Sequence, residues 1–160
     1  MFRDIVMLGV ALSGSAIPAQ EPASLPVLEP AAVVARAESL LEKEPIRVRF
    51  RVAQMDTVGV TTADGASFTQ IRLHPDLEWD KSVRKTFDVM LSPEVERTLK
   101  RIGVTNLPAH FKGKVIDVQG RLHRTVLQTK FGKPAWFYHI EIRGLDQIHS
   151  VTAPAASAGL

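Results

Sequence analysis

The segment 46–52 alternates strictly between apolar and charged side chains. A repeat of two is that of an extended strand, because the faces of a helix repeat every 3.6 residues. The pattern therefore predicts a half-buried strand with a basic outer face. The sequence IRVRFRV places Ile46, Val48, Phe50 and Val52 on one face and Arg47, Arg49 and Arg51 on the other.

The same alternation recurs further along the chain and predicts four more strands. The first strand is expected to continue towards Val60, where Asp64-Gly65 is a hairpin signal. In the last strand Trp136, Tyr138, Ile140 and Ile142 are expected to face inward, and Phe137, His139, Glu141 and Arg143 outward. The fourth strand is expected to expose Asp117, Gln119, Arg121 and His123. The four segments are Phe68–Leu73, Thr86–Leu91, Val115–Arg124 and Trp136–Arg143.

One helix is predicted between the third and fourth strands. Ser92 is suited to cap it and Pro93 to occupy its first position, while Gly103 is suited to end it. The helix is expected over 93–102, with Val95, Leu99 and Ile102 facing in, and a loop holding Pro108 follows it. The order of strand, strand, strand, helix, strand, strand predicts an all-β fold with one or two helices, a five-stranded Greek-key OB-fold barrel.

The last two predicted strands carry a family resemblance. The segment His110–Leu122 reads HFKGKVIDVQGRL, and HIEIR and DQI follow it at 139–143 and 146–148. This text resembles the closing strands of nucleic-acid-binding-type OB-fold domains, and the chain is similar to small exported bacterial OB-fold proteins. The resemblance implies an OB-fold, and Gly120, in the middle of the predicted fourth strand, independently suits the sharp bend that such a small barrel needs. It does not imply a particular ligand, because one fold serves many functions.

The N-terminal residues have the order of parts found in a secretory signal. Arg3 precedes an apolar run from Ile5 to Leu12, and small residues follow it. Residues 1–19 are therefore expected to be a cleaved signal peptide, with a buried N-terminal helix or strand as the alternative. The chain has no Cys for a lipid anchor, and no apolar run approaches the roughly 20 residues of a membrane span. We expect a periplasmic or secreted protein.

The remaining segments are assigned by composition. Residues 20–30 are rich in proline and are expected to be a linker, and residues 31–45 an acidic helix covering one end or edge of the domain. The barrel is expected over 46–150, and residues 151–160 are expected to be a disordered tail.

Positive charge gathers in the second half of the chain. Between Arg97 and Arg143 ten Lys and Arg face two acidic residues, a net charge of +8, whereas residues 56–96 carry a net −4. Cations and rings together suit single-stranded nucleic acid or another polyanion, but a basic strand face is also an ordinary solvated surface. The candidate ligand-binding residues of the last two strands and their loop are Arg121, His123, Arg124, Lys130, Phe131, Lys133, Phe137 and His139.

Two classes of ligand remain open at this stage. Expected export favours a protein, peptide or glycan partner, and the basic hairpin favours a single-stranded nucleic acid. No catalytic or cofactor-binding motif is present, so we expect a non-enzymatic module without cofactors. His123 and His139 face each other across the last predicted hairpin, but no third ligand is evident, and no metal site is expected.

Overall fold

Strands account for most of the structure, a computed structural model that describes residues 25–61, 64–77, 85–128 and 134–154. The predicted signal peptide and the start of the predicted linker lie outside these ranges. The elements are β1 (Val27–Leu28), α1 (Pro30–Ala35), α2 (Ala37–Leu40), β2 (Ile46–Thr61), β3 (Ser67–Pro75), β4 (Lys85–Leu91), α3 (Pro93–Arg101), α4 (Leu107–Phe111), β5 (Val115–Gly120), β6 (Leu122–Gln128), β7 (Pro134–Ile142), the short 3-10 helix η1 (Leu145–Gln147) and β8 (Ile148–Thr152).

The sheet is curled into an OB-like barrel. Its strand order is β6-β7-β4-β3-β2-β5-β8. Strands β5 and β6 lie far apart in this order, but only Arg121 separates them along the chain, so the backbone connects two distant parts of the curled sheet. Strands β4 and β7 pair in parallel, while β2 pairs antiparallel with both β3 and β5. With α3 between β4 and β5, this is the connectivity of the Greek-key barrel expected from the sequence.

The number of strands differs from the prediction, because the described part of the chain contains eight rather than five. The predicted fourth strand is divided at Arg121 into β5 and β6, and β1 and β8 are additional. Gly120 ends β5 at a point where a Cβ atom would lie 2.5 Å from Cγ2 of Ile140. Only glycine allows the strand to pass this close to β7, so the chain can bend from one partner strand to the next.

The barrel interior is built from the predicted apolar faces. The four apolar residues of the first alternating segment are buried in β2, and Tyr138, Ile140 and Ile142 are buried in β7. Trp136 is half-buried and packs against the core. The period-two pattern therefore identified the inner face of these strands correctly.

Helix α3 matches its prediction except at its end. The Ser92 hydroxyl accepts a hydrogen bond from the Val95 backbone N–H, and Val95 and Leu99 are buried. Ile102 was expected to face inward but is 63% exposed, because the helix ends at Arg101 and Gly103 turns the chain with φ of 98°. The predicted loop around Pro108 contains the short helix α4, which the Asn106 side chain caps.

The expected acidic helix over 31–45 is instead two short helices, α1 and α2. The chain leaves the helical path at Leu41, which forms a bridge with Leu122, and the Glu42 backbone N–H donates to the Leu122 carbonyl oxygen at 2.9 Å. These contacts with the barrel replace the hydrogen bonds of a longer helix. Val33 and Ala37 are buried in the core, so the helices do cover the domain as expected.

Both boundaries of the expected barrel extend further than the sequence suggested. Val27 and Leu28, placed in the linker by composition, pair with β2 as β1. Strand β8 pairs with β5 up to Thr152, two residues into the expected tail. Backbone pairing rather than side-chain pattern determines both extensions, and such pairing is not visible in a single segment.

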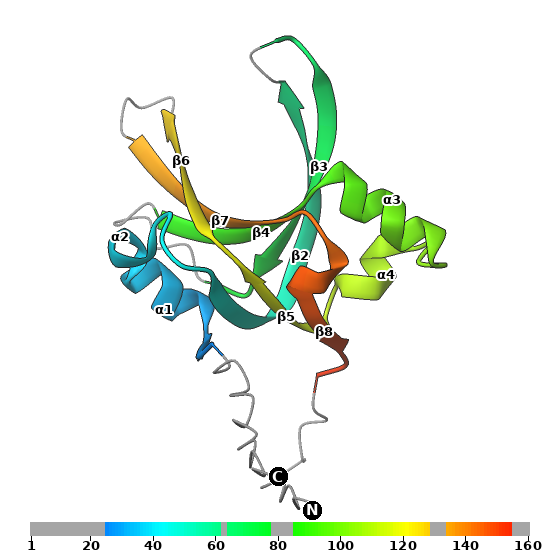
Figure 1. The fold of residues 1–160 in the computed structure, drawn as a ribbon, viewed down its shortest axis with the longest axis horizontal. Coiled ribbons are helices and arrows are strands. Elements are labelled where there is room, and N and C mark those ends of the chain that lie inside the picture. The colour runs from blue at the N-terminus through cyan, green and yellow to red at the C-terminus, as the bar shows by residue number, and fades with distance from the viewer. Residues whose placement is uncertain (1–24, 62–63, 78–84, 129–133, 155–160) are drawn as a thin grey trace, which may run out of the picture.

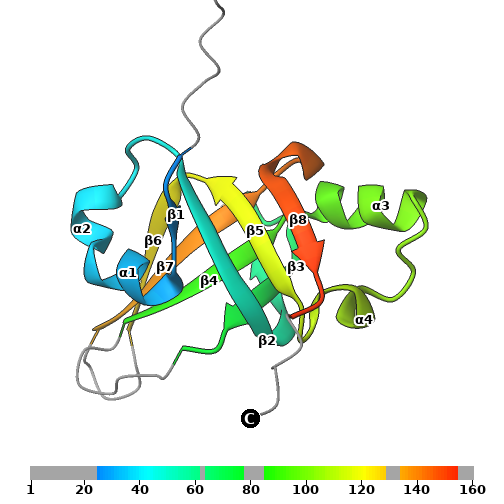
Figure 2. The ribbon, with the colours of Figure 1, turned by 90° about the horizontal axis from the view of Figure 1, so that it is seen from below.

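The helices and the two longest hairpins define the shape of the domain. In both views α1 and α2 lie at one side of the sheet and α3 and α4 at the other (Figures 1 and 2). The β2–β3 and β6–β7 hairpins project from the body on the same side (Figure 1). Within the described ranges no helix is long and apolar enough to cross a membrane.

Candidate ligand-binding surfaces

A row of titratable side chains crosses the outer surface of the sheet from the β6–β7 hairpin to the β2–β3 hairpin. Each strand contributes residues that alternate with its buried positions, so these side chains point away from the core. The strand register places His123 beside His139, His139 beside Asp88, and Asp56 beside Arg72. We call this set the outer row: His123, His139, Asp88, His74, Asp56 and Arg72.

Ion pairs connect one half of the outer row. Arg72 donates two hydrogen bonds of 2.9 Å to the two carboxylate oxygens of Asp56. His74 Nδ1 lies 2.6 Å from Oδ1 of Asp88, which is only 2% exposed. His74 Nε2 lies 3.1 Å from Oδ2 of Asp56, without the alignment of a hydrogen bond. His74 therefore sits between two carboxylates and joins β2, β3 and β4.

The surroundings of His74 favour its charged form. The hydrogen bond with Asp88 raises the pKa of His74 against the opposing effect of burial, and Asp56 adds to the rise. Burial disfavours ionised Asp56, but the hydrogen bonds from Arg72 and the close contact with His74 outweigh it, so the pKa of Asp56 is lowered. With His74 protonated, two cations and two carboxylates balance in this half of the row.

The other half of the outer row is a pair of histidines. The rings of His123 and His139 lie 5.7 Å apart, and among the described residues Nδ1 of His139 is buried without a hydrogen-bond partner. Burial lowers the pKa of His139, and the neighbouring His123 lowers it further. Over the described ranges no group of three or more His, Asp or Glu side chains is arranged to hold a metal ion.

A second set of side chains lies on the opposite surface of the same strands. Lys85 pairs in register with Trp136, and Arg124 pairs with Tyr138. These positions alternate along the strands with those of the outer row. They lie on the face of the sheet that packs on the core, but closer to the hairpin end, where the core no longer covers this face. Val126, beside Trp136, is 50% exposed. We call Lys85, Arg124, Val126 and Trp136 the hairpin cluster.

The carboxylate of Glu38, from α2, contacts the hairpin cluster. Arg124 Nη1 lies 3.1 Å from each Glu38 oxygen, and the Tyr138 hydroxyl donates to Oε1 at 2.9 Å. The Tyr138 hydrogen bond is the main cause of a lowered pKa at Glu38, with the charges of Arg124 and Lys85 contributing. Burial and Glu38 together raise the pKa of Tyr138. Glu38 remains 62% exposed.

The structure separates the predicted site residues into three groups. His123, His139 and Phe137 belong to the outer surface, and Arg121 is exposed between β5 and β6. Arg124 lies in the hairpin cluster on the opposite surface. Lys130, Phe131 and Lys133 fall outside the described ranges.

The sequence interpretation missed several members of both surfaces. Alternation along β4 places Lys85 and Asp88 on opposite faces, and this pattern in the sequence was sufficient to assign each of them to its surface. Their partners could not be found in that way, because His74, Asp56 and Glu38 come from elements distant in sequence. Pairing register and the position of α2 bring these groups together.

The predicted basic face of β2 is largely neutralised. Asp117 was expected to point into solvent but is 1% exposed, because Arg47 and Arg49 enclose its carboxylate. Arg47 Nε lies 2.7 Å and Arg49 Nη2 2.6 Å from its oxygens. Burial disfavours ionisation, yet these hydrogen bonds lower the pKa of Asp117 below its usual value. Local charge counts overestimate the free positive charge here.

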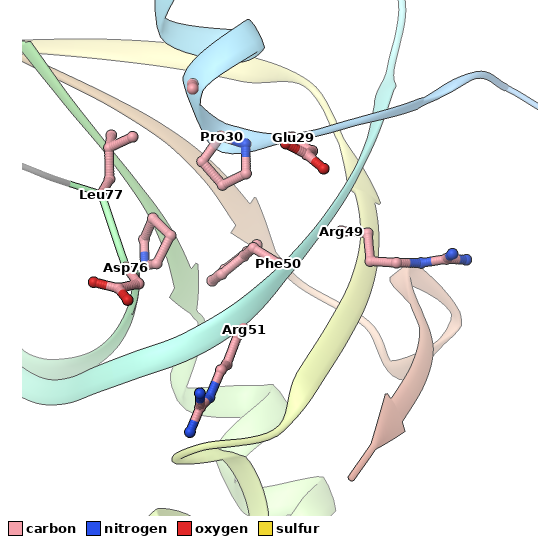
Figure 3. A pocket seen from close by; sticks show the side chains of 9 residues that line it. Glu29, Pro30, Arg49, Phe50, Arg51, Asp76 and Leu77 are labelled. Atoms are coloured by element: carbon pink, nitrogen blue, oxygen red, sulfur yellow. The ribbon is translucent and has the colours of Figure 1, made fainter. Parts of the chain in front are cut away.

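A small hollow lies between α1, β2 and the end of β3 (Figure 3). Pro30, Phe50 and Leu77 supply apolar surface, and Arg49 points away from the space (Figure 3). Its volume is about 280 Å³, at the lower limit of small-molecule sites. Glu29, Arg51 and Asp76 also line it, but its small volume makes it a weaker candidate than either sheet surface.

Comparison with known proteins leaves the OB-like strand order as the basis for classification. No family model matches the chain, and no curated protein matches it. Among solved structures it is similar to one described as Plasmodium falciparum SSB complex with ssDNA, at 15% identity. The match covers 63% of this chain and 87% of that chain, with a TM-score of 0.36. A superposition this loose says nothing about what this chain binds.

Proposed function

We propose that this protein is a non-enzymatic OB-like module that binds single-stranded nucleic acid through the hairpin cluster. The observation that supports the proposal is the register of β4, β7 and β6, which places Trp136 among Lys85, Arg124 and Val126. A ring for stacking and cations for phosphates are the two components of single-strand binding. The adjoining loop carries Lys130, Phe131 and Lys133 in the sequence.

The balance of charge favours this surface over the outer row. Arg72 donates hydrogen bonds from Nε and Nη2 to the two carboxylate oxygens of Asp56, and His74 lies between the carboxylates of Asp56 and Asp88. A phosphate approaching the outer row would meet those carboxylates. In the hairpin cluster Arg124 and Lys85 are opposed by the exposed carboxylate of Glu38 alone among the groups that the structure describes around them.

A protein, peptide or glycan partner is the second candidate, with the outer row as its site. The observation favouring it is the near-neutral set of donors and acceptors across five strands, flanked by Glu141 and the half-buried Phe137. Sugars and peptide groups are recognised by such polar groups with an apolar surface beside them. Binding there would depend weakly on salt, because no net charge is neutralised.

Binding of labelled single-stranded DNA and RNA, followed by fluorescence anisotropy at two salt concentrations, tests the primary proposal. We expect affinity to fall steeply with salt and to weaken in Lys85→Gln. Lys112→Gln is the matched control, because Lys112 is an exposed cation between α4 and β5. Equal weakening in both variants would indicate a general charge effect, and no binding at low salt would reject nucleic acid.

Export is a separate part of the proposal. The order of residues 1–19 supports cleavage of a signal peptide and release into the periplasm or the medium. Mass spectrometry of the protein recovered from cell fractions tests it. Recovery of the uncleaved chain from the cytoplasm alone would contradict export without affecting the proposed ligand surface.

A further inference from the structure

We infer that Glu38 occupies a phosphate subsite of the hairpin cluster, and that a ligand phosphate takes the place of its carboxylate. This inference rests on the proposed function. Two donors converge on Glu38, the guanidinium of Arg124 and the hydroxyl of Tyr138, and the positive charge of Lys85 on β4 also acts on its carboxylate. A charged group, a fixed hydroxyl and a second cation suit the oxygens of a phosphate as well as those of a carboxylate.

The subsite is built on the barrel, whereas its occupant is not. Tyr138 is fully buried and held in β7, so its hydroxyl has a fixed position at the end of the core. Arg124 is its register partner in β6, and Lys85 lies on the adjacent strand β4. Glu38 belongs to α2, a helix of four residues, and is 62% exposed. Displacing its side chain therefore exposes little apolar surface.

The helix that carries Glu38 need not leave the barrel for this exchange. Ala37, the neighbouring residue, is buried at 1% exposure and fixes the helix to the core. Only the side chain of Glu38 has to rotate towards solvent. An exposed ion pair contributes little to stability, so a ligand phosphate that is held by further contacts along the strand is able to compete for it. The geometry indicates an internal competitor for the ligand.

Glu38→Gln in the full chain tests the inference, because glutamine removes the charge but keeps an acceptor for Tyr138. Glu44→Gln is the matched control, since Glu44 is exposed just after α2 and makes the same change in net charge. Inorganic pyrophosphate is the first probe, followed by NMR signals of the Arg124 side chain and the Tyr138 ring. Labelled oligodeoxythymidine is the second probe.

We expect Glu38→Gln to bind both probes about two- to fivefold more tightly than Glu44→Gln. Adding Arg124→Gln is expected to abolish that gain. Equal affinities in Glu38→Gln and Glu44→Gln, or a gain that survives Arg124→Gln, would overturn the inference. Titration of the unaltered chain with pyrophosphate gives a second measurement. The NMR signals of the Arg124 side chain and the Tyr138 ring are expected to shift there too, at a higher pyrophosphate concentration than in Glu38→Gln.

The two probes separate this inference from the proposed function. Pyrophosphate binding at Arg124 with no oligonucleotide binding in any variant would support the subsite and reject the nucleic-acid ligand. Oligonucleotide binding of equal strength in the unaltered chain, Glu38→Gln and Glu44→Gln would support the ligand and reject the subsite. A free phosphate compound is indicated if pyrophosphate binds and oligonucleotides do not compete with it.

Discussion

The outer row and the hairpin cluster both contain ion pairs, but they differ in how their charges are satisfied. In the outer row His74 and Arg72 contact carboxylates that are themselves held by the sheet, and Asp88 is 2% exposed. In the hairpin cluster the opposing carboxylate is the exposed side chain of Glu38. Charges of the same kind thus stabilise the sheet on one surface and, in our proposal, bind a ligand on the other.

The difference follows from burial rather than composition. A buried ion pair is costly to break, because separation leaves an unpaired charge with little water around it. An exposed pair exchanges its partner for water or another ion at small cost. Partner exchange is what a ligand requires, so the less stable pairs are the better candidates for function.

The largest effect is expected for Asp88→Asn in the outer row. The substitution removes the buried charge that holds His74, and the free energy of unfolding is expected to fall by about 2–4 kcal/mol. Urea unfolding measures the change. Asp76→Asn is the control, because Asp76 is exposed just after β3. A change within about 0.5 kcal/mol, as for a surface substitution, would contradict the structural role of the outer row.

The sequence predicted the inner faces of the strands and the position of α3 because both depend on local patterns. Alternation specified which side chains of β2 and β7 are buried, and Ser92 with Pro93 specified the start of the helix. The sequence predicted a bend at Gly120, but it did not predict that the fourth strand is divided into β5 and β6 at Arg121. This division depends on the close passage of Gly120 against Ile140, a contact between two strands.

The arrangement of the candidate site residues depends partly on local pattern and partly on contacts between distant elements. The sequence grouped Arg121, His123 and Arg124 as one basic site, but His123 and Arg124 point to opposite surfaces. The alternation of inward and outward side chains along this strand was sufficient to place His123 and Arg124 on different surfaces. The neutralisation of Arg124 by Glu38 was not predictable, because the pair joins residues 86 positions apart. Net charge along a segment says little about free charge when the partners are distant.

The next largest effect is expected at the ring of the hairpin cluster. Trp136→Ala is expected to weaken binding of single-stranded DNA by about 1–3 kcal/mol, the value of one base stacked on a ring. Trp136 also packs against the core, so the measurement is made below the unfolding temperature of the variant. Phe68→Ala is the control, because Phe68 is an exposed ring on the β2–β3 hairpin. Equal loss in both variants would remove the distinction between the surfaces.

The pH dependence of stability tests the outer row through its two kinds of histidine. The pKa of His74 in the folded protein lies above the usual 6.5, so its contribution is complete below 6.5 and is lost as pH rises through the raised value. The pKa of His139 is lowered, so stability is lost in the opposite direction, as pH falls below 6.5. Urea unfolding across this range is expected to show a maximum, and His74→Gln to remove the decline on its alkaline side. A decline that persists in His74→Gln would assign it to another group.

The smallest effect on stability is expected for Arg124→Gln, and this is the most direct test of the comparison. Its pair with Glu38 is exposed, so the free energy of unfolding is expected to change by less than about 1 kcal/mol. Affinity for single-stranded DNA is nevertheless expected to fall, and the slope of affinity against salt to become shallower by roughly 0.7 for one lost phosphate contact. Asp88→Asn should show the reverse, with reduced stability and an unchanged salt slope at temperatures where it is folded. If both variants lose stability and affinity together, the two surfaces form one network, and the assignment of binding to one of them fails.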